Sequence, residues 1–518
     1  MEEQYQIMKL VTRNIRSTSL HVCGIALLFL SLGIGISGVI TLFDDSVDLT
    51  ALFLSALILA VLGFILFTST TVGDTDQASI FSAVGATWLV VSLLGTVPYL
   101  LAGTFDRAGI GAPEIFVDAL FESVSGFSCT GSTVFGVHNL IEIQGSGILF
   151  YRQLTQWIGG MGIVVLVVSV LPSLRASGLG LIDAEAPGAG VERIAPRVAE
   201  TAKKFWYIYA SLTALVSVLL FATGMGAFDA ISHAMTTAST GGFSTRDLSI
   251  GHWNSVSIEV VIMAGLLLGA TNFTLHARSI EKRRLNYGND SEFKSFIMLL
   301  MSGIILVTLL LTLDGTSFSS ALRVASFNVI TLGSSGGFGN AAGSGSAGDF
   351  VSWTSSTQIV LLFFLIFGGC TGSTSGGVKI MRLRIGLAHA YRTLRSIRRP
   401  RALLQARMGS RTIPDTLVER VAGFVVVYGV LVVAGTFILT ALGSDLITSL
   451  SGVFSALGNM GPGLGEIGPS SSFVDGFSAP GRAVILIFMM IGRLEIFPML
   501  LMFVLPYRSS VKAIKSKN

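Results

Sequence analysis

The chain has 518 residues and a net charge of +4, and 51% of its residues are hydrophobic while only 12% are charged. Soluble domains carry about 25% charged residues, so this composition excludes an ordinary water-soluble protein. Many apolar runs approach the roughly 20 residues that a helix needs to cross a bilayer, and none alternates as a β-barrel strand does. We therefore predict an all-α polytopic membrane protein. Three scattered cysteines, Cys23, Cys129 and Cys370, are too few for a disulfide framework or a zinc site.

The first two apolar runs are predicted to form a membrane hairpin within residues 1–75. A basic N-terminus leads into the run 20–42, which is long for a signal-peptide core and lacks a clear small-residue cleavage site. A short acidic loop separates it from the second run, 51–70. We expect both runs to be retained as spans.

From residue 80 onward one pattern occurs four times: an apolar run, a short half-apolar stretch, a glycine-rich loop and a second apolar run. The short stretches cannot span a bilayer, so we predict re-entrant helices at 114–126, 228–238, 318–332 and 445–457. The longer runs lie at 80–102, 147–171, 205–226, 256–275, 295–313, 358–385, 417–442 and 482–506. Such repetition predicts four structural repeats, at 76–190, 191–290, 291–400 and 401–518.

Lysine and arginine are concentrated in alternate loops, which indicates the orientation of the chain. The segments 172–204, 276–294, 386–420 and 507–518 are strongly basic, whereas the other side retains only Arg107, Arg246, Arg323 and Arg482. The positive-inside rule then predicts cytoplasmic termini, a plasma-membrane location and glycine loops at the outer face. A nucleic-acid surface is the alternative interpretation of the basic loops, but membrane topology alone accounts for them.

The four glycine loops are predicted to form a cation site. Each follows a short helix, whose C-terminal end carries the negative end of its dipole. Non-helical backbone at membrane depth is tolerated where it lines a water-filled path, and its carbonyl oxygens can replace the hydration shell of an ion. The glycines expected to superimpose are Gly131, Gly241, Gly336 and Gly461. A single such loop would be interpreted as a turn between helices; fourfold repetition favours a selectivity filter.

At these loops the sequence resembles the TrkH and KtrB family of potassium uptake proteins, which is related to the plant HKT transporters. The resemblance runs from about residue 80 to the C-terminus, and the preceding hairpin is similar to TrkH. It implies potassium translocation around a central pore. It also implies a filter of four strands: Cys129, Thr130, Gly131 and Ser132; Ser239, Thr240, Gly241 and Gly242; Ser334, Ser335, Gly336 and Gly337; Asn459, Met460, Gly461 and Pro462. Sodium-preferring plant relatives have serine at the first aligned glycine, so Gly131 favours potassium.

The run 358–385 is interrupted by a segment rich in glycine, serine and threonine. This glycine segment comprises Gly368, Gly369, Cys370, Thr371, Gly372, Ser373, Thr374, Ser375, Gly376 and Gly377. The helix before it covers about 15 Å, so the segment is expected near the middle of the bilayer. The resemblance implies an intramembrane loop that gates the pore. A phosphate-binding loop is one alternative, although Val378 displaces its lysine, and close helix packing is another.

Several charged or polar residues lie inside the apolar runs. Arg493 is a functional candidate because intramembrane charge is costly, and the resemblance places it in the pore below the filter. A structural salt bridge is the alternative. We expect Arg152 to be an interfacial anchor and Lys379 to snorkel inward or tether the glycine segment. Glu122 and Asn328 are expected to brace the filter loops.

The resemblance also implies partners: a homodimer on a ring of cytosolic, nucleotide-binding, TrkA-like subunits that faces residues 386–416. The basic surface there can equally meet anionic membrane lipid. We predict no nucleic-acid partner, no enzyme activity and no cofactor, with K⁺ as the transported ion and Na⁺ or Rb⁺ as other possible cargo. A Na⁺- or H⁺-coupled K⁺ symporter, or a Na⁺ transporter, on the same fold is the alternative function.

Overall fold

The structure, a computed structural model, describes residues 2–43, 48–71, 77–107, 109–162, 198–398, 405–408 and 411–494. Over these residues its regular secondary structure is helical, as predicted, apart from an antiparallel hairpin of β1 (Arg407–Met408) and β2 (Arg411–Thr412). Among the described residues, six helices are long and apolar enough to cross a membrane, and a bent pair makes a seventh candidate span. Several predicted features lie outside the described residues: 163–171 and 495–506 of two apolar runs, the basic segments 172–197 and 507–518, and the expected boundaries at 75/76, 190/191 and 400/401.

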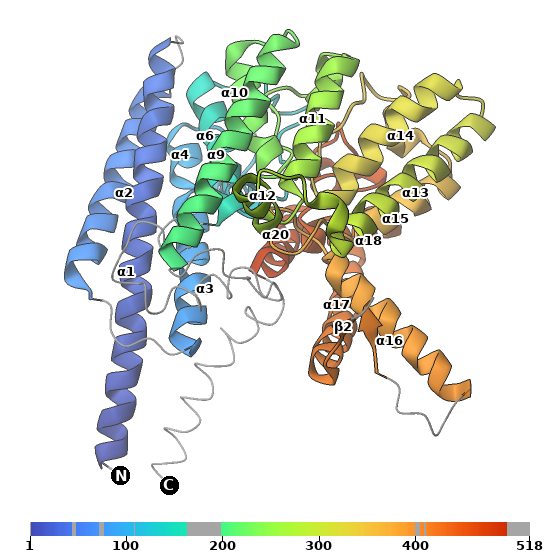
Figure 1. Cartoon of the computed structure of the whole chain (residues 1–518). Coiled ribbons are helices and arrows are strands. Elements are labelled where there is room, and N and C mark those ends of the chain that lie inside the picture. The colour runs from blue at the N-terminus through green and yellow to red at the C-terminus, as the bar shows by residue number, and fades with distance from the viewer. Residues whose placement is uncertain are drawn as a thin grey trace.

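The predicted N-terminal hairpin is formed by α1 (Glu2–Ile40) and α2 (Leu49–Ser69), which lie side by side at one edge of the molecule (Figure 1). The short η1 (Thr41–Phe43) ends the first helix. Gly24 and Gly63 face each other, and a Cβ built on either glycine would lie within 3 Å of the other's carbonyl oxygen. Small residues at this crossing let the two backbones approach closely, as membrane helices often do.

The rest of the described chain follows the predicted order of long helix, short helix, loop and second helix. The long helices are α3 (Gln77–Leu94) continued by α4 (Val97–Leu101), α9 (Val198–Ala222), α13 (Ser291–Leu313) and α17 (Asp415–Ala441). The short helices are α5 (Ala112–Phe127), α10 (Ala227–Ala238), α14 (Phe318–Gly333) and α18 (Leu446–Gly458). The second helices begin as α6 (Ser146–Met161), α11 (Val256–Gly269), α15 (Ser355–Phe364) and α20 (Ala479–Leu494).

The long helices and the short helices occupy different environments. Apolar side chains such as Phe221 on α9, Leu309 on α13 and Phe437 on α17 are exposed, which suits helices that face lipid. The short helices are instead buried along their C-terminal halves, although those halves contain serine, threonine and asparagine. Short segments complete the connecting loops: η3 (Ser249–His252), η4 (Tyr287–Asn289), η5 (Phe350–Ser352), η6 (Gly465–Ile467) and α19 (Phe473–Gly476).

Within the residues that the structure describes, two of the second helices are broken, where only one break was expected. As predicted, α15 ends before the glycine segment, and helix resumes as α16 (Ile380–Arg398), which packs on α17 and extends away from the bundle (Figure 1). The prediction of an unbroken run at 256–275 is wrong, because α11 and α12 (Phe273–Glu281) meet at 92°. Asn272 starts the new helix by accepting a hydrogen bond from the Thr274 backbone N–H at 2.8 Å.

Candidate functional site

The four glycine loops share one backbone conformation. Each begins with a non-glycine residue at positive φ, and two residues later a glycine has positive φ again. The first set is Cys129, Thr240, Ser335 and Asn459, and the second is Gly131, Gly242, Gly337 and Gly461. The residue between them donates its N–H to a carbonyl of the preceding helix, for example Thr130 to Ser125 and Gly241 to Thr236. The equivalent strands are therefore Cys129–Ser132, Thr240–Phe243, Ser335–Phe338 and Asn459–Pro462.

This geometry corrects the expected superposition. The sequence pattern predicts that Gly241 and Gly336 superimpose on Gly131, but the positive-φ glycines are the next residues in both loops. Ser239 and Ser334 consequently lie one position before the strands, as buried C-caps of α10 and α14.

The four strands close into a ring, here called the loop ring. A Cβ on Gly131 would overlap the Gly241 carbonyl oxygen, and one on Gly242 would overlap that of Gly336. A Cβ on Gly337 would lie 2.5 Å from the Met460 carbonyl oxygen, and one on Gly461 would lie 3.0 Å from that of Thr130. Each strand thus touches the next, and the fourth returns to the first. Only glycine fits this close approach at positive φ.

The loop ring has the electrostatics of a cation site. It begins at the C-terminal ends of α5, α10, α14 and α18, where the negative ends of the helix dipoles lie. No acidic or basic residue occurs in the four strands. Serine hydroxyl groups form hydrogen bonds to the strand backbone instead. Ser455 and Ser132 donate to the Gly461 carbonyl at 2.6 and 2.8 Å, and the bond from Ser132 joins the first strand to the fourth.

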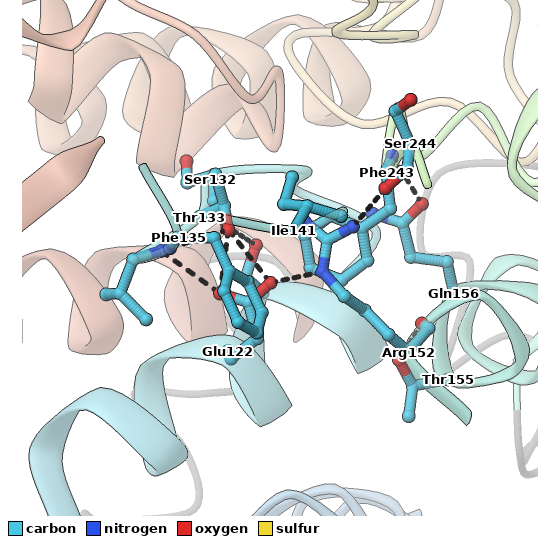
Figure 2. A network of polar contacts seen from close by, with 12 residues as sticks. Glu122, Ser132, Thr133, Phe135, Ile141, Arg152, Thr155, Gln156, Phe243 and Ser244 are labelled. Atoms are coloured by element: carbon cyan, nitrogen blue, oxygen red, sulfur yellow. Dashed lines mark hydrogen bonds and ion pairs between the residues drawn. The ribbon is translucent and has the colours of Figure 1, made fainter. Parts of the chain in front are cut away.

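A buried ion pair joins the residues that directly follow the first and second strands. Arg152 Nε lies 2.5 Å from Glu122 Oε1, and both side chains are fully buried. Glu122 also accepts hydrogen bonds from the Thr133 hydroxyl and the Val134 N–H, while Arg152 donates to the Ser244 carbonyl at 2.7 Å (Figure 2). The expectation that Arg152 anchors at the membrane interface is wrong, since its charge is neutralised inside the protein.

The other predicted bracing residue lies behind the third strand. Asn328 on α14 donates to the Asn340 side-chain oxygen at 3.0 Å and to the Val324 carbonyl at 2.9 Å. Asn328 is fully buried, so it connects the helix to the chain that leaves the third strand.

The glycine segment packs against the loop ring. Its Gly376 N–H donates to the Ser335 hydroxyl at 2.7 Å, and the Thr374 hydroxyl lies 3.3 Å from that of Thr240. A Cβ on Gly376 would lie 2.9 Å from the Asn459 Cβ. Residues 368–377 are all buried or half-buried. The segment therefore touches the second, third and fourth strands.

Backbone exposed by the break in α11 holds the same segment. The last carbonyls of a helix lack partners within it. Here the Gly269 carbonyl accepts from the Thr374 hydroxyl at 3.0 Å and the Ala270 carbonyl accepts from the Cys370 N–H at 2.8 Å. In return, the Phe273 N–H donates to the Gly372 carbonyl at 3.0 Å. The backbone groups at this break, which the sequence analysis missed, therefore bind the glycine segment and are here called its receptor.

Two charged side chains form hydrogen bonds to the segment. One carboxylate oxygen of Glu292, at the start of α13, accepts from the N–H and hydroxyl of Thr371, both at 2.8 Å, and from the Met381 N–H at 3.0 Å. Lys379 donates to the Ser375 carbonyl, so the interpretation of this lysine as a tether is supported. Glu292 was missed, although a carboxylate opening a 23-residue apolar helix was a usable signal.

Arg493 lies against the glycine segment on the side of α6. It donates to the Thr374 carbonyl at 3.1 Å, to the Gly160 carbonyl at 3.1 Å and to the Gly159 carbonyl. Its hydrogen-bond acceptors among the described residues are backbone oxygens rather than carboxylates. The positive charge therefore bridges the segment and the end of α6.

Gln156 is a second residue that the sequence analysis missed. Its amide, fully buried on α6, forms two hydrogen bonds with the backbone of the second strand. Its signal was a polar side chain in the middle of an apolar run.

Comparisons with known proteins match most of the chain. The family of TrkH cation transport proteins matches residues 51–513. The Trk system potassium uptake protein TrkH of Halomonas elongata is 37% identical over 421 residues, which are 80% of this chain and 83% of that protein. The Trk system potassium uptake protein TrkG of Escherichia coli (strain K12) is 30% identical over 494 residues, 93% of this chain and 96% of that protein. The crystal structure of the potassium transporter TrkH from Vibrio parahaemolyticus superimposes with a TM-score of 0.81 at 32% identity, covering 93% of this chain and 97% of that one.

Proposed function

Since the chain belongs to the TrkH family of cation transport proteins, and is thus a transporter rather than an enzyme, we propose that it conducts K⁺ through the loop ring. The observation that carries this proposal is the closed ring of four strands at four helix C-termini. In this proposal the ring is a selectivity filter, the four helix–loop units are pore repeats around a central path, and α1 with α2 stands outside them. The relatives are potassium uptake proteins by name, which favours K⁺ as cargo.

The glycine segment serves as the gate in this proposal. Support comes from its place against three of the four filter strands and from its polar bonds to Ser335, Gly269 and Ala270. Arg493 adds a positive charge at the same level, which raises a barrier to a cation that has passed the ring. Opening then requires the segment to leave these partners.

The proposed orientation and partners follow from the positions of basic residues. The termini, α12 and α16 lie on the cytoplasmic side, and the loop ring opens to the outside. The arginines of α16, such as Arg395 and Arg398, offer a surface for cytosolic, nucleotide-binding, TrkA-like subunits beneath a homodimer. The relatives belong by name to a multi-component Trk system, which supports a partner of this kind.

Reconstitution tests the proposed function. Purified protein in liposomes is expected to take up Rb⁺ down its gradient, in preference to Na⁺, without any imposed pH or Na⁺ gradient. Liposomes without protein serve as the control. Uptake that depends on a second gradient would favour the symporter alternative, and equal uptake of Na⁺ and Rb⁺ would contradict a K⁺ filter.

Thr374→Val should weaken the closed gate. The valine keeps the shape of the side chain but removes the hydroxyl that donates to the Gly269 carbonyl at 3.0 Å. One buried hydrogen bond contributes about 1 kcal/mol, so Rb⁺ uptake without a regulatory partner should rise by about fivefold. Thr308→Val is the matched control, because that buried hydroxyl on α13 has no hydrogen-bond partner among the described residues. Uptake unchanged by Thr374→Val would count against the gate.

A further inference from the structure

Two of the filter strands contain consecutive glycines, and the first glycine of each pair packs under a side chain from the preceding repeat. A Cβ on Gly336 would lie 2.6 Å from a methyl group of Leu266 on α11. A Cβ on Gly241 would lie 2.5 Å from the amide carbon of Gln156 on α6. Neither Gly241 nor Gly336 has positive φ, so the backbone conformation does not require glycine at either position. The close packing of the Gln156 and Leu266 side chains is the feature that favours glycine there.

Internal repetition shows that Gln156 and Leu266 are equivalent. Gly159 on α6 packs against the Phe127 carbonyl, and Gly269 on α11 packs against that of Ala238. Phe127 and Ala238 both lie two residues before the first positive-φ residue of their strands. Counting back three residues from each glycine gives Gln156 and Leu266. The same position thus holds an amide in the first repeat and an alkyl side chain in the second.

The amide makes bonds that leucine cannot make. Gln156 Nε2 donates to the Gly241 carbonyl at 2.7 Å, and its Oε1 accepts from the Phe243 N–H at 3.0 Å. Figure 2 shows the side chain reaching from α6 to this strand. Gln156 is fully buried, so water does not replace either bond. The amide therefore pairs with two backbone groups of one strand and fixes their direction.

We infer that Gln156 determines ion selectivity by orienting the Gly241 carbonyl from behind the filter. This inference rests on the proposed function. A carbonyl oxygen has two lone pairs, so the bond from Gln156 leaves one for a cation. A donor bonded to the carbonyl oxygen also increases the polarisation of the carbonyl and resists its rotation. Selectivity depends on the field strength and arrangement of such carbonyls, and a strand free to turn fits the smaller Na⁺ more readily.

Gln156→Met tests the inference, with Leu266→Met as the control at the equivalent position. Methionine fills a similar volume without either hydrogen bond. In proteoliposomes, Gln156→Met is expected to lower the ratio of Rb⁺ to Na⁺ uptake by about fivefold, as loss of a buried hydrogen bond implies. Leu266→Met should leave that ratio unchanged. The ratio is informative because partial misfolding lowers both fluxes together.

A second variant reaches the same bond from the strand. Gly241→Ala introduces a Cβ that displaces the Gln156 amide, at a residue whose φ an alanine can adopt. Like Gln156→Met, it should lower the ratio of Rb⁺ to Na⁺ uptake. If Gln156→Met does not fold, Gly241→Ala serves as the test of the role of Gln156. An unchanged ratio in the folded variants, together with a lowered ratio in Gly242→Ala, would overturn the role of Gln156 and leave the filter intact. If Gly242→Ala also kept the wild-type ratio, the proposed filter itself would fail.

Discussion

Arg152→Met is expected to destabilise the protein by about 3–5 kcal/mol, because it leaves the Glu122 carboxylate buried without its counter-charge. The two side chains have 1% and 0% of their surface exposed, so water cannot take over the role of the arginine. The variant also loses the bond from Arg152 to the Ser244 carbonyl and the stacking of its guanidinium 3.6 Å above the Phe243 ring. Thermal unfolding in detergent should show a fall in Tm and a lower yield of monodisperse protein.

Lys204→Met is the matched control for Arg152→Met. Lys204 also pairs with a carboxylate, that of Glu281, but the two side chains are 42% and 45% exposed. Exposed ion pairs contribute about 0–1 kcal/mol, so its Tm should stay close to that of the wild type. Adding Glu122→Gln to Arg152→Met should recover part of the lost stability. A Tm for Arg152→Met equal to that of the wild type would contradict the buried pair.

Gly242→Ala is expected to lower the ratio of Rb⁺ to Na⁺ uptake at least tenfold or to abolish uptake. The new Cβ would overlap the Gly336 carbonyl and lie 2.9 Å from the Gly337 carbonyl carbon. Both are backbone atoms of the next strand, so the ring must open to admit the methyl group. Alanine at φ +80° also adds strain of about 1–2 kcal/mol.

Gly443→Ala separates the effect of backbone strain at positive φ from the effect of contact between the new Cβ and a neighbouring strand. Gly443 has φ +101°, but no atom of the described part of the chain lies within 4 Å of its ideal Cβ. This variant should therefore lose some stability and keep its ion selectivity. Gly461→Ala supplies an intermediate case, since its nearest backbone neighbour is 3.0 Å from the ideal Cβ. Equal effects of the alanine at positions 242 and 443 would show that the ring contact is unimportant.

The repeated order of helices was predictable, but the register of the strands was not. Four short stretches before four glycine loops indicated α5, α10, α14 and α18, because both features are local in the chain. In the second and third loops, however, two adjacent glycines serve different purposes. Gly241 and Gly336 make room for a side chain of another repeat, whereas Gly242 and Gly337 supply positive φ. One sequence cannot distinguish these reasons, and the alignment was one residue off.

The remaining errors concern contacts between distant residues. Glu122 and Arg152 are 30 positions apart on different helices, so nothing local indicated that they pair. The break between α11 and α12 contains no glycine cluster, and its one signal was the capping residue Asn272. Glu292 meets Thr371 only because two repeats pack together. Such features follow from the assembled fold rather than from any segment.

The receptor for the glycine segment at the end of α11 consists of main-chain oxygens, those of Gly269 and Ala270. Every amino acid supplies the same carbonyl, so a substitution at residue 270 keeps the hydrogen-bond acceptor that the receptor uses there. A side chain at residue 269, in contrast, would lie 2.9 Å from the Ala238 carbonyl oxygen. A genetic screen for leaky variants should therefore recover changes at Thr374 or Glu292 more often than at residue 270. The closed state should therefore tolerate mutation at residue 270, which contributes only its backbone to the contact. Substitutions at Thr374 or Glu292, which contribute side chains, should change how readily the gate opens.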